Sequence, residues 1–163
     1  MGEPTAARLT DRQQVWRGLL QGQRAMLLRL GVELKRDFGL TIPQYEALLA
    51  LHQGPRRGLP ATRLARELLY SSGSGSNLIA RIEQLGYVRR STGDTDARTQ
   101  LVTLTEAGED LIVRATEAHV AALRAEFEPL IDDDEVAVLL RFARRLAEHE
   151  GVHAQPPEPV EPD

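Results

Sequence analysis

Apolar residues recur at steps of three and four through the first forty residues, which is the spacing of one face of an α-helix. Thr10 and Gln13 have the spacing of a capping box, and Gly39 is a typical C-terminal stop. The sequence therefore predicts a helix from residue 10 to about residue 37. Its apolar face comprises Val15, Trp16, Leu19, Leu20, Met26, Leu27, Leu30 and Leu34.

A second helical pattern runs over residues 41–54 and ends in a Gly/Pro turn at residues 54–58. A short helix at residues 60–68 follows, and then an amphipathic one at 71–85 that opens with small polar residues and stops at Gly86. Two short helices, a tight turn and a strand predict a helix-turn-helix leading into a wing, a unit that places one helix in a DNA major groove.

Two β-prone runs, 87–91 and 100–104, flank a loop long enough to form a projecting wing. Thr105 suits the N-cap of a helix that ends before Pro129, and acidic residues from Asp132 suit the start of a last helix to about Glu150. The Pro-rich, acidic residues 151–163 predict a disordered tail.

The fold class is thus mainly α with a small β-hairpin wing: a winged helix-turn-helix with N- and C-terminal dimerisation helices. A small winged core cannot cover the apolar stripes of the long helices, so a two-fold partner is expected; the alternative is a monomer whose helices cover one another. The expected parts are a flexible arm (1–9), an N-terminal dimerisation helix (10–39), the DNA-binding region (40–105), C-terminal dimerisation helices (106–150) and the tail (151–163).

Composition narrows the function classes. The 163 residues include no cysteine, which excludes disulfides and thiolate metal sites, and the four histidines lack a convincing ligand spacing. No nucleophile elbow, phosphate loop or HExxH motif indicates an enzyme. No signal segment or apolar run of about 18 residues is found, so a cytoplasmic protein without cofactor or metal is expected.

The net charge of −4 is unevenly distributed. Residues 56–98 hold eight arginines and four acidic residues, whereas residues 99–163 hold five arginines and fifteen acidic residues. Contact with phosphates needs a basic face rather than a basic protein, so this distribution favours DNA binding by the helix-turn-helix and wing. A mixed solvated surface is the alternative.

This order of elements resembles the MarR family of winged helix-turn-helix regulators over residues 11–147. The recognition-helix stretch 71–87 is similar to the family's Ser-Ser-Gly-Thr-x-Thr-Asn type, and Asp96-Ala97-Arg98 followed by Leu104-Thr105-Glu106-Ala107-Gly108 matches its Asp-x-Arg and Leu-Thr-x-x-Gly patterns. The resemblance implies an obligate dimer on a palindromic operator, usually a repressor released by a small anionic or aromatic ligand.

DNA contacts are expected from both the recognition helix and the wing. Serine hydroxyls and the N–H groups of the helix N-terminus can bind phosphates, and Asn77 can form paired hydrogen bonds with adenine. Gly73 and Gly75 would allow the helix to approach the DNA closely. An arginine at the tip of a hairpin can enter a narrow minor groove. In the family the aspartate of the Asp-x-Arg pair holds this arginine. The candidates are Ser71, Ser72, Ser74, Ser76, Asn77, Arg81, Arg89, Arg90, Asp96 and Arg98, with Arg63 and Arg66 as further backbone contacts.

Ligands of the family sit between the dimer helices and the winged domain. The Trp16-Arg17 pair, with Glu46, is similar to the urate-responsive branch, which suggests a phenolic or purine-like anion. The residues expected to line the site are Trp16, Arg17, Arg24, Tyr45 and His52. Alternative functions of the same fold are an activator or a DNA binder that responds to no ligand, a protein-interaction module without sequence-specific DNA binding, and a ligand scavenger.

The wing hypothesis gives a first prediction. Arg98→Ala should weaken operator binding at least several-fold and leave the dimer intact, because it removes only the side chain that enters the minor groove. Fluorescence anisotropy at matched salt, with gel filtration for oligomeric state, measures both effects. Unchanged affinity would remove the wing from the mechanism.

Overall fold

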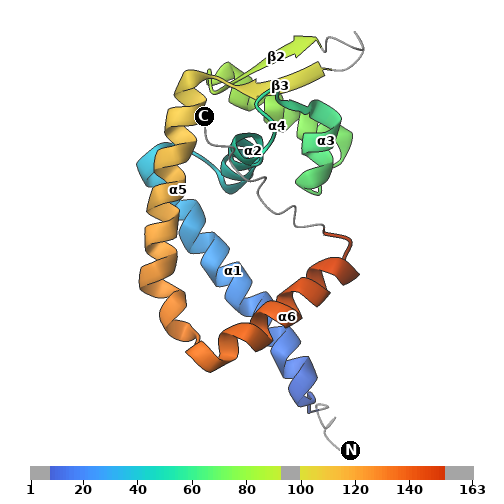
Figure 1. Ribbon diagram of the computed structural model, residues 1–163, viewed down its shortest axis with the longest axis vertical. Helices are drawn as coiled ribbons and strands as arrows, with labels where there is room; N and C mark the ends of the chain where they lie inside the picture. The colour runs from blue at the N-terminus through green and yellow to red at the C-terminus, as the bar shows by residue number, and fades with distance from the viewer. Residues whose placement is uncertain (1–7, 93–99, 153–163) are drawn as a thin grey trace, which may run out of the picture. The chain divides into compact units, whose positions relative to one another are not determined.

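The computed structural model describes residues 8–92 and 100–152 (Figure 1). The chain divides into two compact units, residues 1–42 and 43–163. Most of the expected N-terminal arm and most of the expected C-terminal tail lie outside the described residues, as does the loop at residues 93–99.

The first unit contains α1 (Asp11–Phe38), which begins and ends as the sequence predicts. Gln13 Oε1 accepts a hydrogen bond from the Thr10 N–H at 2.9 Å, the Thr10 side chain accepts in return from the Gln13 N–H, and Gly39 closes the helix with φ +70°. Most apolar side chains of α1 remain exposed; Trp16 exposes 56% of its surface, whereas Leu34 is buried.

The second unit begins with α2 (Ile42–Gln53) and continues through a two-residue strand, β1 (Leu59–Pro60), into α3 (Ala61–Glu67) and α4 (Ser72–Gln84). The hairpin strands β2 (Val88–Thr92) and β3 (Gln100–Leu104) follow. The helices confirm the predicted helix-turn-helix, with boundaries shifted by one or two residues.

The sheet contains a strand that the sequence analysis missed. The order is β1-β3-β2, all antiparallel, with Leu59 opposite Val102 and Val88 opposite Leu104. Gly58, at φ +89°, lies so close to the Val102 carbonyl that a Cβ would overlap it. The sequence predicts a two-stranded hairpin, whereas the structure has a three-stranded sheet in which Pro60 belongs to β1. Helix α3 therefore starts at Ala61 rather than at Pro60.

A long helix, α5 (Glu106–Glu126), leaves the wing, and the 3₁₀ turn η1 (Glu128–Leu130) and α6 (Asp133–His149) follow (Figure 1). Thr105 caps α5 by accepting from the Gly108 N–H at 3.1 Å, and Pro129 lies in the turn that separates the two helices, as predicted. No residue of α6 is buried. Within the described ranges, no helix is long and apolar enough to cross a membrane.

The apolar core of the second unit lies where α2, the helix-turn-helix, the sheet and the start of α5 contribute inward-facing side chains. These residues are less than a tenth exposed and set the orientation of α3 and α4. They are Tyr45, Ala47, Leu48, Leu51, Leu59, Leu64, Ala65, Ile79, Ile82, Val88, Val102, Leu111, Ile112 and Ala115.

The turn between α3 and α4 places a leucine in a left-handed conformation. The Leu69 N–H donates to the Arg66 carbonyl at 3.0 Å and the Tyr70 N–H donates to the Ala65 carbonyl at 2.9 Å, which is the Schellman pattern. Leu69 has φ +57° and is the only non-glycine residue with positive φ among the residues described. Its side chain is 77% exposed, so no burial offsets the strain.

Helix α4 ends in the same motif with the preferred residue. The Gly86 N–H donates to the Glu83 carbonyl at 2.9 Å, the Tyr87 N–H donates to the Ile82 carbonyl at 3.2 Å, and Gly86 has φ +79°. Helix α6 ends in this motif as well, with Gly151 at φ +68°, so Leu69 occupies a position that glycine fills at the ends of α4 and α6.

Leu69→Gly should stabilise the protein. A left-handed conformation costs a leucine about 1–2 kcal/mol, and glycine removes that cost. The greater conformational freedom of glycine in the unfolded chain offsets about half of this stabilisation. The melting temperature should rise by about 2–4 °C at fixed protein concentration. Gly86→Ala at the equivalent position is the matched control and should lower it. A lower melting temperature for Leu69→Gly would show that the exposed leucine contributes more than its strain costs.

Candidate nucleic-acid interface

Close packing of α3 on α4 positions the candidate recognition helix. Gly75 is buried, and a Cβ at this position would overlap the Ala65 Cβ and lie 3.2 Å from the Ala65 Cα. Gly75, Ile79 and Ile82 share the inner face of α4. The expectation that Gly75 lets DNA approach is therefore wrong: this glycine lets another helix approach. Gly73 is exposed, and a Cβ there would meet nothing within 4 Å.

The opposite face of α4 is polar and exposed. At 100° per residue, Asn77, Arg81 and Gln84 fall on the face turned away from the buried Gly75, Ile79 and Ile82. The serines of the first turns, Ser72, Ser74 and Ser76, are exposed as well but lie to either side of that face. All the predicted α4 contacts are thus accessible. Sequence reasoning missed Gln84, although its spacing of seven from Asn77 indicates the same face.

Ser71 stands just before the helix and is its N-cap. Its Oγ accepts from the Ser74 N–H at 3.4 Å and donates to the Ser74 Oγ at 3.1 Å. The Ser71 hydroxyl therefore holds the first turn together, and the remaining free N–H groups of that turn are the natural anion contacts of a helix N-terminus.

The two arginines of β2 differ in their surroundings. Arg89 is exposed, and its Nε donates to the Thr103 hydroxyl on β3 at 3.2 Å. Arg90 turns to α4, where its Nε lies 3.2 Å from Glu83 Oε2 and its Nη2 donates to the Ser76 carbonyl at 3.3 Å. Arg90 therefore already has protein partners where a phosphate was expected. Asp96 and Arg98 lie outside the described residues.

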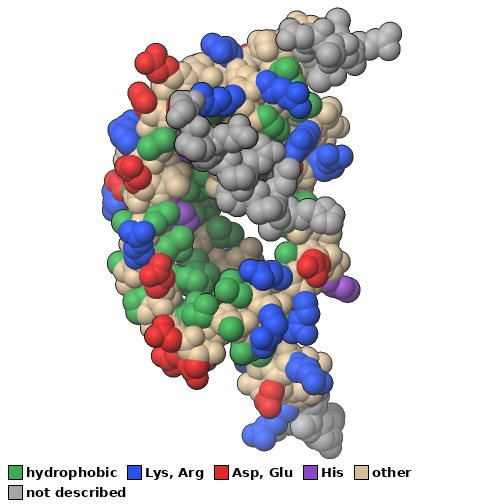
Figure 2. Space-filling view, in the orientation of Figure 1, with side chains coloured by type: hydrophobic (Ala, Val, Ile, Leu, Met, Phe, Trp, Pro, Cys, Tyr) green, Lys and Arg blue, Asp and Glu red, His purple; other side chains and the backbone are tan. Residues whose placement is uncertain are grey.

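The two arginines of α3 also differ in their surroundings. Arg63 pairs with Glu67, with 2.7 Å between Nε and Oε1, whereas Arg66 is exposed. Arg56 and Arg57, in the turn before β1, are exposed as well. Basic side chains gather over the helix-turn-helix and wing, while acidic side chains follow the outer edge of α5 and its turn into α6 (Figure 2). On the face that Figure 2 shows, the winged region is thus basic, as the sequence predicts, although Lys and Arg side chains also lie over α6.

The MarR family model matches residues 38–99, which hold the helix-turn-helix and the first wing strand. The chain is similar to AbsC, a MarR family transcriptional regulator from Streptomyces coelicolor, at 30% identity and a TM-score of 0.81 over 91% of this chain and 100% of that one. It is similar to Sco3205 of the same organism, solved in complex with DNA, at 30% identity and a TM-score of 0.79 over 90% and 92% of the two chains. An HTH-type transcriptional repressor of Mycobacterium bovis is 30% identical over 110 residues, 60% of this chain and 78% of that protein.

The chain belongs to the MarR family. It is therefore a transcriptional regulator whose winged helix-turn-helix carries the DNA-binding function, and the exposed face of α4 is its candidate recognition surface.

The residues predicted to line a ligand site in this MarR family protein belong to different parts of the chain. Trp16, Arg17 and Arg24 are exposed on α1, in the first unit, whereas Tyr45 and His52 lie on α2. A ligand site formed by all five stays a prediction.

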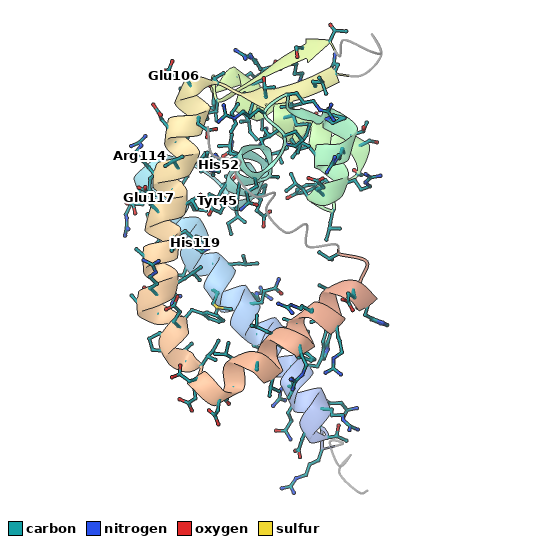
Figure 3. The ribbon with its side chains drawn as sticks, in the orientation of Figure 1. Tyr45, His52, Glu106, Arg114, Glu117 and His119 are labelled. Atoms are coloured by element: carbon teal, nitrogen blue, oxygen red, sulfur yellow. The ribbon has the colours of Figure 1, made fainter. Side chains whose placement is uncertain are left out.

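The two α2 residues contact α5 (Figure 3). Tyr45 is 4% exposed, and its ring meets the His119 ring edge-on at a centroid separation of 5.8 Å. His52 Nδ1 lies 2.7 Å from Glu109 Oε1. On the same helix, desolvation raises the pKa of the Glu46 carboxyl. Tyr45 and His52 therefore join α2 to α5, and a ligand that reached them would have to share or displace these contacts.

The two glycines of α4 give a matched pair of predictions. Gly75→Ala should lower the free energy of unfolding by about 1–3 kcal/mol, because its methyl group overfills the contact with Ala65. Gly73→Ala should not lower it, because the added methyl group meets open space and alanine favours the helix. Chemical denaturation of both variants measures the difference. Equal stability of the two variants would contradict the α3–α4 packing.

Proposed function

We propose that this MarR family protein is a homodimeric, sequence-specific DNA-binding repressor that a small anionic or aromatic ligand releases from its operator. The observation that carries the proposal is the division of α4 into a tightly packed inner face and an exposed polar outer face. A rigid helix with accessible hydrogen-bonding side chains is what a major groove accommodates.

The outer face of α4 supplies three kinds of contact. Its first turn presents N–H groups and serine hydroxyls to phosphates. Asn77 reads adenine through paired hydrogen bonds, and Arg81, one turn further along the exposed face, contacts guanine or a phosphate. Arg98 of the wing enters the neighbouring minor groove.

Dimerisation follows from apolar surface on the helices outside the winged region. On α6, Val138 and Leu140 are at least half exposed, and the preceding Leu130 is 73% exposed. Apolar surface of this extent indicates an interface, and a second copy of the chain is the simplest occupant. Two recognition helices would then read half-sites about 34 Å apart, one turn of DNA.

Repression and ligand release complete the proposal. The relative from Mycobacterium bovis is described as a repressor, which supports the same role here. We propose a phenolic or purine-like anion as the effector, with Trp16, Arg17, Arg24, Tyr45 and His52 as its contacts. The ligand would favour a spacing of the recognition helices that does not fit successive grooves.

Addition of such compounds to the complex of the protein with DNA should release free DNA. If none of them released DNA, the proposal of a phenolic or purine-like effector would be rejected.

Operator binding by Arg81 variants tests the function. The protein should bind a duplex from upstream of its own gene more tightly than a scrambled duplex. Arg81→Ala should weaken that binding at least several-fold and reduce the slope of log affinity against log salt by about 0.9 for each phosphate that the variant no longer neutralises. Fluorescence anisotropy across a salt series gives both values.

Arg114→Ala is the matched control, because Arg114 is an exposed arginine on α5 whose loss changes the net charge equally. It should bind as the unaltered protein does. The contrary result is that the unaltered protein binds both duplexes equally weakly and selects nothing from a random duplex pool. That result would favour a protein-interaction module, in which the acidic segment 99–163 would contact the partner.

A further inference from the structure

The junction between the recognition helix and the wing contains a set of polar contacts that DNA binding does not explain. The Arg90 N–H donates to Glu83 Oε1 at 3.2 Å, the Arg90 Nε lies 3.2 Å from Glu83 Oε2, and the Arg90 Nη2 donates to the Ser76 carbonyl at 3.3 Å. One strand residue thus contacts α4 through both its backbone and its side chain.

The geometry of α4 makes these contacts span the helix. Ser76 and Glu83 are seven residues apart, so they lie on one side of α4 and about 10 Å apart along its axis. Ser76 is adjacent to Asn77, the candidate adenine contact. Arg90 therefore fixes two successive turns of the recognition helix against β2, one of them next to the side chain expected to read a base.

The neighbouring arginine provides the contrast. Successive side chains of a strand point to opposite faces, and Arg89 accordingly turns away from α4 and stays exposed. The Arg90 side chain is 26% exposed and its charge faces the Glu83 carboxylate. A phosphate would have to displace that carboxylate to reach Arg90, whereas Arg89 is exposed and donates to the neutral Thr103 hydroxyl.

We propose that Glu83 and Arg90 are positioning residues that hold the recognition helix at a fixed angle to the wing, and that they determine sequence selectivity rather than contact phosphate. The proposal rests on the proposed DNA-binding function. It assigns the phosphate contact of this strand to Arg89.

Glu83→Gln separates positioning from simple electrostatics because the two act on different quantities. If electrostatics alone acted, removing a negative charge beside the interface would raise the affinity for every duplex and leave the selectivity unchanged. Loss of positioning instead lowers the selectivity, which is the ratio of the affinities for a selected duplex and its scrambled version. The probe is a duplex recovered by the unaltered protein from a random 40-base-pair pool. We expect this ratio to fall about tenfold, which is the discrimination of one good base contact.

Arg89→Gln and Arg90→Gln form a matched pair with the same change of charge. Arg90→Gln should lower the selectivity ratio and leave the salt slope unchanged. Arg89→Gln should keep the ratio and reduce the slope by about 0.9 for each phosphate that it no longer neutralises. Arg90→Lys, which keeps the charge but lacks the planar fork, should behave like Arg90→Gln. Retained selectivity in Glu83→Gln and Arg90→Lys, or a reduced slope in Arg90→Gln, would overturn the proposal.

Hydrogen exchange without DNA keeps the test independent of binding. In folded Glu83→Gln and Arg90→Lys, the α4 amides should exchange faster than in the unaltered protein, and in Arg89→Gln they should not. Unchanged exchange in both positioning variants would also overturn the proposal. If the unaltered protein selects no duplex from the pool, the proposed function itself fails, and that result is distinct from selective binding that survives in the variants.

Discussion

The contact between Gly75 and Ala65 is the constraint on which the DNA-binding surface depends. Because α4 carries no side chain at this point, it lies directly on α3, with the Ala65 Cα only 3.2 Å from where a Cβ would be. A helix held this closely by its inner face has one orientation for its outer face. The proposed base contacts, Asn77 and Arg81, would therefore lie on a helix that DNA does not have to order, which would avoid the entropic cost of fixing a mobile helix on binding.

A second close contact ties the wing to α5. A Cβ on Gly108 would overlap the Tyr87 carbonyl, the Thr105 N–H donates to that same carbonyl at 3.0 Å, and the Thr105 hydroxyl donates to the Gly86 carbonyl at 2.6 Å. The end of the recognition helix, the start of β2 and the N-cap of α5 thus meet at one point. The Leu-Thr-x-x-Gly pattern, which served as a family signature in the sequence, is this junction in the structure.

The elements predicted correctly depend on local signals. The capping box at Thr10, the stop at Gly39 and the cap at Thr105 act within one helical turn, so a single sequence reveals them. Strand β1 was missed because two residues carry no alternation. Gly75 was assigned to the wrong face, although its spacing from Ile79 and Ile82 could have placed it inside. Likewise, strand alternation could have separated Arg89 from Arg90, but only the fold reveals that Glu83 is the partner of Arg90.

The α2–α5 contacts provide a physical route from the long helices to the recognition surface. His52 with Glu109, and Tyr45 with His119, join α2 to α5, while Gly108 joins α5 to the wing at Tyr87. A tilt of α5 would therefore move α2 and the wing together. Because α3 and α4 share their buried core with α2 and the sheet, the recognition helix would follow as part of one rigid body. The proposed effector would therefore not need to touch the exposed face of α4 to control it; it would only need to favour one direction of α5 over another.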